Sequence, residues 1–219
     1  MQKDDSCPPT KGAYPSDCEL TQALLERARA RQADPVRSEA WIACLAQARA
    51  VRLLLLDVDG VLTDGTIIYT ENGGEIKAFH TRDGMGLRLL RETGVEIGLI
   101  TARQSAAVTR RAQDLGLTHV YQKAGNKLAI FERLLAELGL APAEVAYLGD
   151  DWLDLPLITR VGLAAAVADA APEVRQRAHY VTELPGGRGA VRELCDLLIE
   201  AKGMRQSLLA RYIAGNGNK

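Results

Sequence analysis

Short, unbroken apolar runs that lead directly into acidic or hydroxyl residues are the feature that most constrains the fold of this chain. Residues 51–56 read VRLLLL and are followed by Asp57, and residues 144–149 lead into Asp150 in the same way. A continuous apolar run of this length is typical of a strand buried on both faces of a parallel sheet. Helical periodicity separates these runs, so the pattern predicts a doubly wound, Rossmann-like α/β fold.

The alternation allows individual elements to be predicted from their residue ranges. Strands are expected at 51–60, 95–101, 118–122, 144–151 and 163–168. Helices are expected at 84–93, 104–115, 155–161, 172–178 and 189–202, together with one that Asn126 caps. One stretch breaks the alternation: residues 66–80 contain two strand-like pieces around Asn72-Gly73-Gly74, which predicts a β-hairpin insertion.

The pattern also divides the chain into three parts. Residues 1–50 are expected to form an N-terminal arm, unstructured over 1–19 where Pro, Asp, Ser and Gly are frequent, then helical over 20–33 and 37–50. These helices either extend from the body as an arm or pack on it. The main domain is expected to span 51–203, and 204–219 is expected to be a loose C-terminal tail.

Charge and cysteine content exclude several classes of function. The net charge is −1 without a basic stripe, which argues against nucleic acid as a partner. The cysteines form no CxxC pair and have no histidine at metal-ligand spacing, so neither a disulfide framework nor a zinc site is expected. No run approaches the ~20 apolar residues of a membrane span, and the N-terminus lacks a signal-peptide pattern. We therefore expect a cytoplasmic protein without a membrane partner.

Polar side chains with chemical potential follow the predicted strands. They are Asp57 and Asp59 after the first strand, Thr101 and Arg103 after the second, Lys127 after the third, and Asp150, Asp151 and Asp154 after the fourth. Each has an ordinary explanation when taken alone, such as a turn for Asp57 and Asp59 or a helix cap for Asp154. Because the carboxyl ends of parallel strands share one edge, four segments together favour a functional site.

The residue types at this edge fit phosphoryl transfer. Clustered carboxylates repel one another unless a cation lies between them, and Mg²⁺ prefers oxygen ligands. Thr101 and Lys127 are donors that suit an anion on the opposite side. A nucleophilic carboxylate, a metal and donors to the phosphoryl oxygens are the parts that phosphoryl transfer needs.

The motifs in this order resemble those of a known superfamily. LLLLDVDGVLTDG, LITAR, Lys127 and LGDDWLD resemble the four motifs of the haloacid-dehalogenase superfamily of phosphatases over about residues 51–182. Within it, residues 51–203 resemble the 3-deoxy-D-manno-octulosonate 8-phosphate (KDO 8-phosphate) phosphatases, through DVDGVLTDG, GGEIKAFHTRDGMG, LGDDWLDLPL and GGRGAVRELCDLL.

The resemblance implies roles for these residues. Asp57 would be the nucleophile that forms a phosphoaspartate, and Asp59 the general acid and base. Mg²⁺ would be held by Asp57, the backbone carbonyl of Asp59, and Asp150, with Asp151 and Asp154 supporting them. Thr101 and Lys127 would bind phosphoryl oxygens. The sugar acid would meet Asp59, Lys127 and the positions His80, Thr81, Arg82, Asp83, Gly84, Arg88, Arg103 and Arg111. Ala102 and His80 depart from the residues common in the family.

The spacing of the motifs leaves no room for a cap domain over the site. Only 44 positions separate Asp57 from Thr101, and they contain the hairpin. An uncapped site and exposed strand edges both point to a closed homo-oligomer. The resemblance implies a homotetramer with the hairpins at its centre, in which the Gly-rich stretch 185–190 reaches a neighbour's site.

Three functions remain open from the sequence. The leading one is hydrolysis of KDO 8-phosphate to KDO and phosphate, in lipopolysaccharide precursor synthesis. The second is a phosphatase for another sugar acid, such as a nonulosonate 9-phosphate. The third, a non-catalytic regulatory domain, is disfavoured because every motif carboxylate is present. A mutase or an ion pump is disfavoured by the missing cap and membrane span.

Overall fold

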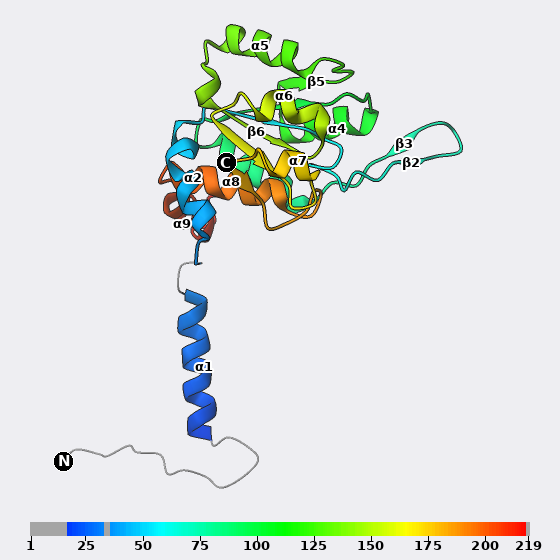
Figure 1. Ribbon diagram of the computed structural model, residues 1–219. Helices are drawn as coiled ribbons and strands as arrows, with labels where there is room; N and C mark the ends of the chain where they lie inside the picture. The colour runs from blue at the N-terminus through cyan, green and yellow to red at the C-terminus, as the bar shows by residue number, and fades with distance from the viewer. Residues whose placement is uncertain (1–16, 33–35, 218–219) are drawn as a thin grey trace, which may run out of the picture. The chain divides into compact units, whose positions relative to one another are not determined.

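A six-stranded parallel sheet forms the centre of the computed structural model, which describes residues 17–32 and 36–217 (Figure 1). The strand order is β5-β4-β1-β6-β7-β8, and each neighbouring pair is parallel. The strands are β1 (Leu53–Leu56), β4 (Glu96–Ile100), β5 (His119–Tyr121), β6 (Val145–Gly149), β7 (Leu163–Ala166) and β8 (Tyr180–Val181). The prediction of a doubly wound α/β sheet is confirmed, with β8 as a short strand that the sequence pattern did not indicate.

Burial explains why the central strands read as unbroken apolar runs. All four leucines of β1 are fully buried, and β1 pairs with β4 on one side and β6 on the other. A strand in this position has helices over both faces, so it has no solvated face on which a polar residue would alternate. The first polar side chains therefore occur where the strand ends, at Asp57.

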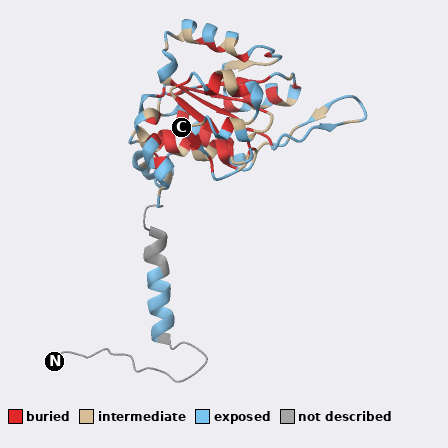
Figure 2. Cartoon of the chain, in the orientation of Figure 1, coloured by how far each residue is buried: buried red, intermediate tan, exposed pale blue. Residues whose placement is uncertain are grey.

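Helices cover both faces of the sheet (Figure 2). One layer contains α2 (Glu39–Ala50), α3 (Thr81–Arg91) and α8 (Ala190–Ala201), in which α2 and α3 both pack on α8. The opposite layer contains α5 (Lys127–Leu138) and α6 (Leu155–Ile158). Further helical elements of this body include α4 (Ala106–Leu115), α7 (Pro172–Arg175), and the 3₁₀ turns η1 (Pro142–Glu144) and η2 (Trp152–Asp154). The Asn126 side chain accepts from the Ala129 amide at 3.1 Å, so the predicted cap of α5 is present.

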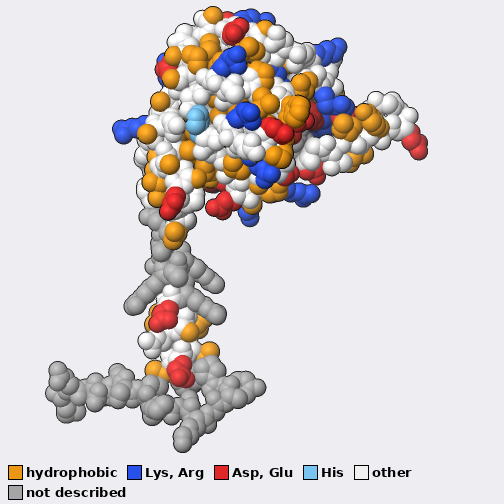
Figure 3. Space-filling view, viewed as in Figure 1, with side chains coloured by type: hydrophobic (Ala, Val, Ile, Leu, Met, Phe, Trp, Pro, Cys, Tyr) orange, Lys and Arg blue, Asp and Glu red, His pale blue; other side chains and the backbone are white. Residues whose placement is uncertain are grey.

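The hairpin insertion leaves the body as an extended arm. Strands β2 (Ile68–Tyr69) and β3 (Glu75–Ile76) pair antiparallel, and the Thr70 amide donates to the Gly74 carbonyl at 2.9 Å. Gly73 has φ +74°, a conformation that a glycine adopts without strain. Apolar side chains lie along the arm in Figure 3, and Ile68, Tyr69 and Ile76 are all exposed. The predicted hairpin is therefore present, with an apolar surface that its own body does not cover.

The N-terminal boundary of the domain differs from the prediction. Trp41 and Cys44 of α2 are buried in the core, and the compact unit begins at Glu39 instead of residue 51. The reason is tertiary, because the apolar face of α2 covers α8 and the sheet edge at β8. Before this unit, the described residues include α1 (Asp17–Gln32), whose bounds agree closely with the helix predicted at 20–33. Most of the stretch 1–19 lies outside the described residues.

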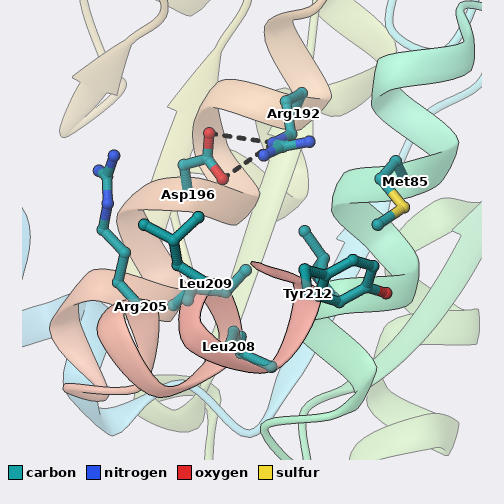
Figure 4. A pocket seen from close by; sticks show the side chains of 9 residues that line it. Met85, Arg192, Asp196, Arg205, Leu208, Leu209 and Tyr212 are labelled. Carbon is teal, nitrogen blue, oxygen red and sulfur yellow. Dashed lines mark hydrogen bonds and ion pairs between the residues drawn. The ribbon is translucent and has the colours of Figure 1, made fainter. Parts of the chain in front are cut away.

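The C-terminal tail is also more ordered than expected. Residues 204–217 include α9 (Arg205–Ile213), and Leu208 on this helix is only 6% exposed. A hollow of about 250 Å³ lies between α9, α8 and α3. Figure 4 shows Leu208 and Tyr212 of α9 and Met85 of α3 beside it. The Gly and Asn near the chain end suggested a loose tail, but the apolar face of RQSLLARYI packs on neighbours that are distant in sequence.

Candidate active site

A cleft of about 170 Å³ lies where the carboxyl ends of β1, β4 and β6 meet. Its lining includes all eight polar residues expected at this edge, namely Asp57, Asp59, Thr101, Arg103, Lys127, Asp150, Asp151 and Asp154. The remaining lining residues are Ala102 and Leu153. The structure therefore brings four segments of the sequence into one concave site.

The Lys127 ammonium lies between two buried carboxylates. It is 2.9 Å from Asp57 Oδ1 and 2.6 Å from Asp154 Oδ1, and Asp57 is only 8% exposed. The Asp57 amide donates to the Leu148 carbonyl at 3.0 Å, which holds the residue at the end of the sheet ladder. Backbone and ammonium together leave the Asp57 carboxylate with little freedom to turn away from the cleft.

Asp154 connects the acidic loop to Lys127. Its Oδ1 accepts from Lys127 Nζ and, at 2.5 Å, from the Tyr147 hydroxyl, and its Oδ2 accepts from the amides of Asp150 and Asp151 at 2.8 and 3.2 Å. Both oxygens are thus used within the protein. Tyr147 is fully buried in β6 and was not among the predicted site residues. The sequence feature that could have identified Tyr147 is its hydroxyl, the one polar side-chain atom within the apolar run VAYLG.

Burial and mutual repulsion perturb the acidic groups. Burial raises the pKa of the Asp57 carboxyl to about 6, although the nearby Lys127 ammonium lowers it. Burial and then the charge of Asp57 raise the pKa of Asp150 to about 8. The pKa of Lys127 is lowered by burial but raised more strongly by Asp57 and Asp154, so the net shift is upward. These acids are too crowded for one lysine to neutralise.

The cleft fits a hard divalent cation. Asp57, Asp150 and Asp154 each offer an oxygen, and these oxygens lie within 4.8 Å of one another. Asp154 is already fully hydrogen-bonded, so Asp57 and Asp150 have the carboxylate oxygens that are available to a metal. Gly60, at φ +90°, lets Asp150 approach closely, because a Cβ there would overlap the Asp150 carboxylate. An all-oxygen donor set with excess negative charge suits Mg²⁺.

Lys77, which follows the hairpin strand β3, reaches Asp59, and Glu75 of β3 lies beside it. Lys77 Nζ pairs with Asp59 Oδ1 and with Glu75 Oε1, the latter at 2.8 Å. The other Asp59 oxygen accepts from the Thr101 hydroxyl at 3.3 Å. Arg103 extends this chain of charges, since its guanidinium lies 3.4 Å from Glu75. Lys77 and Glu75 were not predicted as site residues, although both lie in the stretch GGEIKAFHTRDGMG, which is one of those that carry the family resemblance.

Of the residues expected to bind the sugar acid, Asp59, Arg103 and Lys127 line the cleft. The others do not. Five of them lie at the start of α3, Arg88 lies in its last turn, and Arg111 lies on α4; the five are His80, Thr81, Arg82, Asp83 and Gly84. Arg111 donates to the His80 carbonyl at 3.3 Å and lies 5.6 Å from the Phe79 ring centre. Gly84 makes room for Arg111, because a Cβ there would overlap the guanidinium.

Two of these residues have structural partners within the chain. The buried Asp83 carboxylate accepts from the Arg192 amide at 2.8 Å and so holds the first turn of α8. Arg88 donates to the Asp114 carbonyl at 3.0 Å, near the end of α4. Asp83 and Arg88 therefore have structural roles in this chain, and their contact with substrate stays a prediction.

The Gly-rich stretch 185–190 packs against its own chain. The Gly187 amide donates to the Val61 carbonyl at 2.9 Å, and the Gly186 amide donates to Asp169 Oδ1 at 3.0 Å. Gly186 lies so close to the Gly60 carbonyl that a Cβ would overlap it. This stretch supports the loop that follows β1 in its own chain, and its reach to a neighbouring subunit stays a prediction.

The fold and the site together define a class of enzyme. A parallel sheet with acids after β1 and β6, a hydroxyl after β4 and a lysine at the start of α5 is the arrangement of a haloacid dehalogenase-like hydrolase. Residues 116–193 match the family model of that description. In the described part of the chain, no helix is long and apolar enough to cross a membrane.

Similar proteins narrow this class. The 3-deoxy-D-manno-octulosonate 8-phosphate phosphatase of Escherichia coli (strain K12) is 52% identical over 159 residues, which are 73% of this chain and 85% of that protein. The crystal structure of the Yersinia pestis phosphatase of the same name is 46% identical with a TM-score of 0.74, covering 75% of this chain and 89% of that one.

A third similar structure contains ligands. The phosphatase of this name from Moraxella catarrhalis, in complex with magnesium, phosphate and KDO, is 38% identical with a TM-score of 0.75 and covers 77% of this chain and 97% of that one. This chain belongs to the family of 3-deoxy-D-manno-octulosonate 8-phosphate phosphatases.

Proposed function

We propose that this chain hydrolyses 3-deoxy-D-manno-octulosonate 8-phosphate to KDO and inorganic phosphate, with Mg²⁺ as cofactor. The observation that carries the proposal is the cleft, where the motif residues of a family at 52% identity meet in an acidic, oxygen-rich site. The ligands in the Moraxella catarrhalis structure, which are magnesium, phosphate and KDO, support the same substrate and cofactor.

The chemistry is assigned to two aspartates. Asp57 attacks the phosphorus atom, the bond from phosphorus to the sugar oxygen breaks, and Asp59 gives that oxygen a proton. Water then attacks the phosphoaspartate while Asp59 takes a proton from it, which releases phosphate and regenerates Asp57. The support is positional: Asp57 is held at the end of β1, and Asp59 lines the same cleft.

The remaining residues hold the phosphoryl group and the cation. We assign Mg²⁺ to Asp57, Asp150 and the backbone carbonyl of Asp59, with Asp151 and Asp154 supporting that arrangement. Bound magnesium neutralises charge on the phosphoryl oxygens during transfer. Thr101 and Lys127 donate to those oxygens, and Arg103 is assigned to the substrate carboxylate because it lines the cleft as a partly exposed cation.

The substrate assignment is tested by phosphate release from a panel of phosphorylated sugars and sugar acids, with Mg²⁺ and with EDTA. We expect Mg²⁺-dependent release with the highest kcat/KM on KDO 8-phosphate. A higher kcat/KM on a nonulosonate 9-phosphate would replace the substrate while leaving the reaction class intact. If a folded, Mg²⁺-loaded protein releases phosphate from none of the esters, the enzymatic function is contradicted.

We also propose that the hairpin arm makes the enzyme a homotetramer. An exposed two-stranded ribbon with Ile67, Ile68, Tyr69 and Ile76 on its surface is unstable alone and favours burial against copies of itself. Light scattering coupled to size-exclusion chromatography measures the mass directly. We expect four chains per particle for the wild type and fewer for the double variant Ile68→Asp, Ile76→Asp. A monomeric wild type would contradict this assembly.

A further inference from the structure

Lys77 occupies an unusual position for a lysine. It follows the exposed strand β3, yet its side chain is only 1% exposed and its ammonium is enclosed between the carboxylates of Asp59 and Glu75. Lysines are almost never this buried unless an ion pair compensates for lost hydration. The hairpin arm therefore does more than project outward, because its base inserts a cation beside the cleft.

The strand geometry fixes which residues reach inward. Glu75 and Lys77 are two positions apart, so their side chains leave the same side of the strand, while Ile76 between them is exposed. Glu75 also pairs with Arg103 at 3.4 Å and so lies between two cations. Arg103, Glu75, Lys77 and Asp59 form one continuous chain of alternating charges that ends at the cleft.

We propose that Lys77, supported by Glu75, is the positioning residue that sets the orientation of the Asp59 carboxylate. One Asp59 oxygen is held by Lys77 and the other by the Thr101 hydroxyl, which fixes the plane of the carboxylate relative to Asp57. Without Lys77, a carboxylate that is partly exposed is free to turn toward water. Among the described residues, Asp59 is the lining residue of the cleft with which Lys77 pairs, so Lys77 acts through Asp59.

This role makes a specific kinetic prediction. An alkyl leaving group needs the proton that Asp59 delivers, whereas p-nitrophenolate leaves without one. Misplacing an acid by about 1 Å lowers rates by roughly 10²-fold. Lys77→Met should therefore lower kcat/KM for KDO 8-phosphate by about 10- to 100-fold and change kcat/KM for p-nitrophenyl phosphate by less than about threefold. A general structural defect would lower both values equally.

Two further variants separate positioning from folding. Lys77→Arg keeps a cationic donor and should recover part of the kcat/KM that Lys77→Met loses on the alkyl ester. Lys202→Met removes a lysine at the end of α8, away from the cleft, and should leave kcat/KM for both substrates unchanged. Circular-dichroism melting of each variant shows whether it is folded.

A double-mutant cycle identifies the residue through which Lys77 acts. If Lys77 works through Asp59, then Lys77→Met in an Asp59→Asn background should change kcat/KM for the alkyl ester by less than about twofold. Equal losses in both backgrounds, or equal losses on alkyl and aryl esters, would overturn the proposal.

Because Asp59 acts as acid and base only in the proposed reaction, the role of Lys77 rests on the proposed function. The alkyl ester in these assays is the one that the wild type cleaves fastest in the substrate panel. A wild type that prefers another ester overturns the proposed substrate but leaves the Lys77 comparison intact. A wild type that cleaves no ester overturns both.

Discussion

Removing the Tyr147 hydroxyl tests whether the buried support beneath the cleft positions Asp154 and Lys127. Tyr147 is fully buried in β6, and its hydroxyl donates to Asp154 Oδ1 at 2.5 Å and lies 3.3 Å from Lys127 Nζ. Tyr147→Phe keeps the ring and its packing and deletes one donor to a buried carboxylate. The variant therefore separates the hydrogen bond from the volume of the side chain.

The size of the effect follows from the charge of the acceptor. A hydrogen bond to a charged group contributes about 1.5–3 kcal/mol to folding. For a domain of this size, that loss lowers the melting temperature by roughly 3–12 °C. Because Asp154 also accepts from the amides of Asp150 and Asp151, a shift of its carboxylate moves the acidic loop, and we expect kcat/KM to fall by about 10-fold.

Tyr180→Phe is the matched control. The Tyr180 hydroxyl donates to Glu193 at 2.6 Å, also from a buried tyrosine to a carboxylate, but at the far edge strand β8. Thermal melting in EDTA and steady-state kinetics with Mg²⁺ are measured for both variants. We expect comparable losses of stability and a loss of kcat/KM only for Tyr147→Phe. Equal kcat/KM values in the two variants would refute the positioning role of Tyr147.

Three further perturbations probe the charges and the boundary of the fold. Lys127→Met leaves the carboxylates of Asp57 and Asp154 without a counter-charge. We expect the free energy of unfolding, measured by urea denaturation in EDTA, to fall by about 3–5 kcal/mol, and kcat to fall by about 10²- to 10³-fold. A near-normal kcat would contradict this role of Lys127. The raised pKa values of Asp57 and Asp150, about 6 and about 8, mean that the unfolded chain releases these protons at lower pH than the metal-free folded chain. The melting temperature in EDTA should therefore fall as pH rises from about 4 to about 8, and the increase caused by Mg²⁺ should grow over that interval; a flat profile would argue against crowded acids. Leu208→Ala should lower the free energy of unfolding, measured by urea denaturation, by about 2–5 kcal/mol because Leu208 is buried. It should leave kcat/KM unchanged because α9 packs away from the cleft. An unchanged free energy of unfolding would show that α9 is not docked.

Much of the fold was predictable because its strongest signals are local. The run that forms β1 is apolar on both faces, and the cap at Asn126 marks where α5 begins. The docking of α2 and α9 was not predictable, because the packing of residues such as Trp41 and Leu208 depends on partners far away in the chain.

The site also has a part that the sequence predicts and a part that it does not. Parallel strands must bring their carboxyl ends to one edge, so the meeting of Asp57, Thr101 and Asp150 followed from topology. The contacts of Tyr147 and Lys77 depend on side-chain directions that no spacing rule encodes. The sequence also did not reveal the structural partners of residues at the start of α3, such as the Arg192 amide that donates to Asp83, and their contact with substrate stays a prediction.

The most direct test of the account is to identify the phosphorylated residue. The enzyme is mixed with KDO 8-phosphate and Mg²⁺, quenched in acid within milliseconds and digested, and the peptides are read by mass spectrometry. We predict one added phosphoryl group on Asp57, labile to hydroxylamine, and none in Asp57→Asn, which should also release no phosphate. Turnover by a folded Asp57→Asn variant, or a phosphoryl group on another residue, would contradict the assignment of Asp57 as the nucleophile.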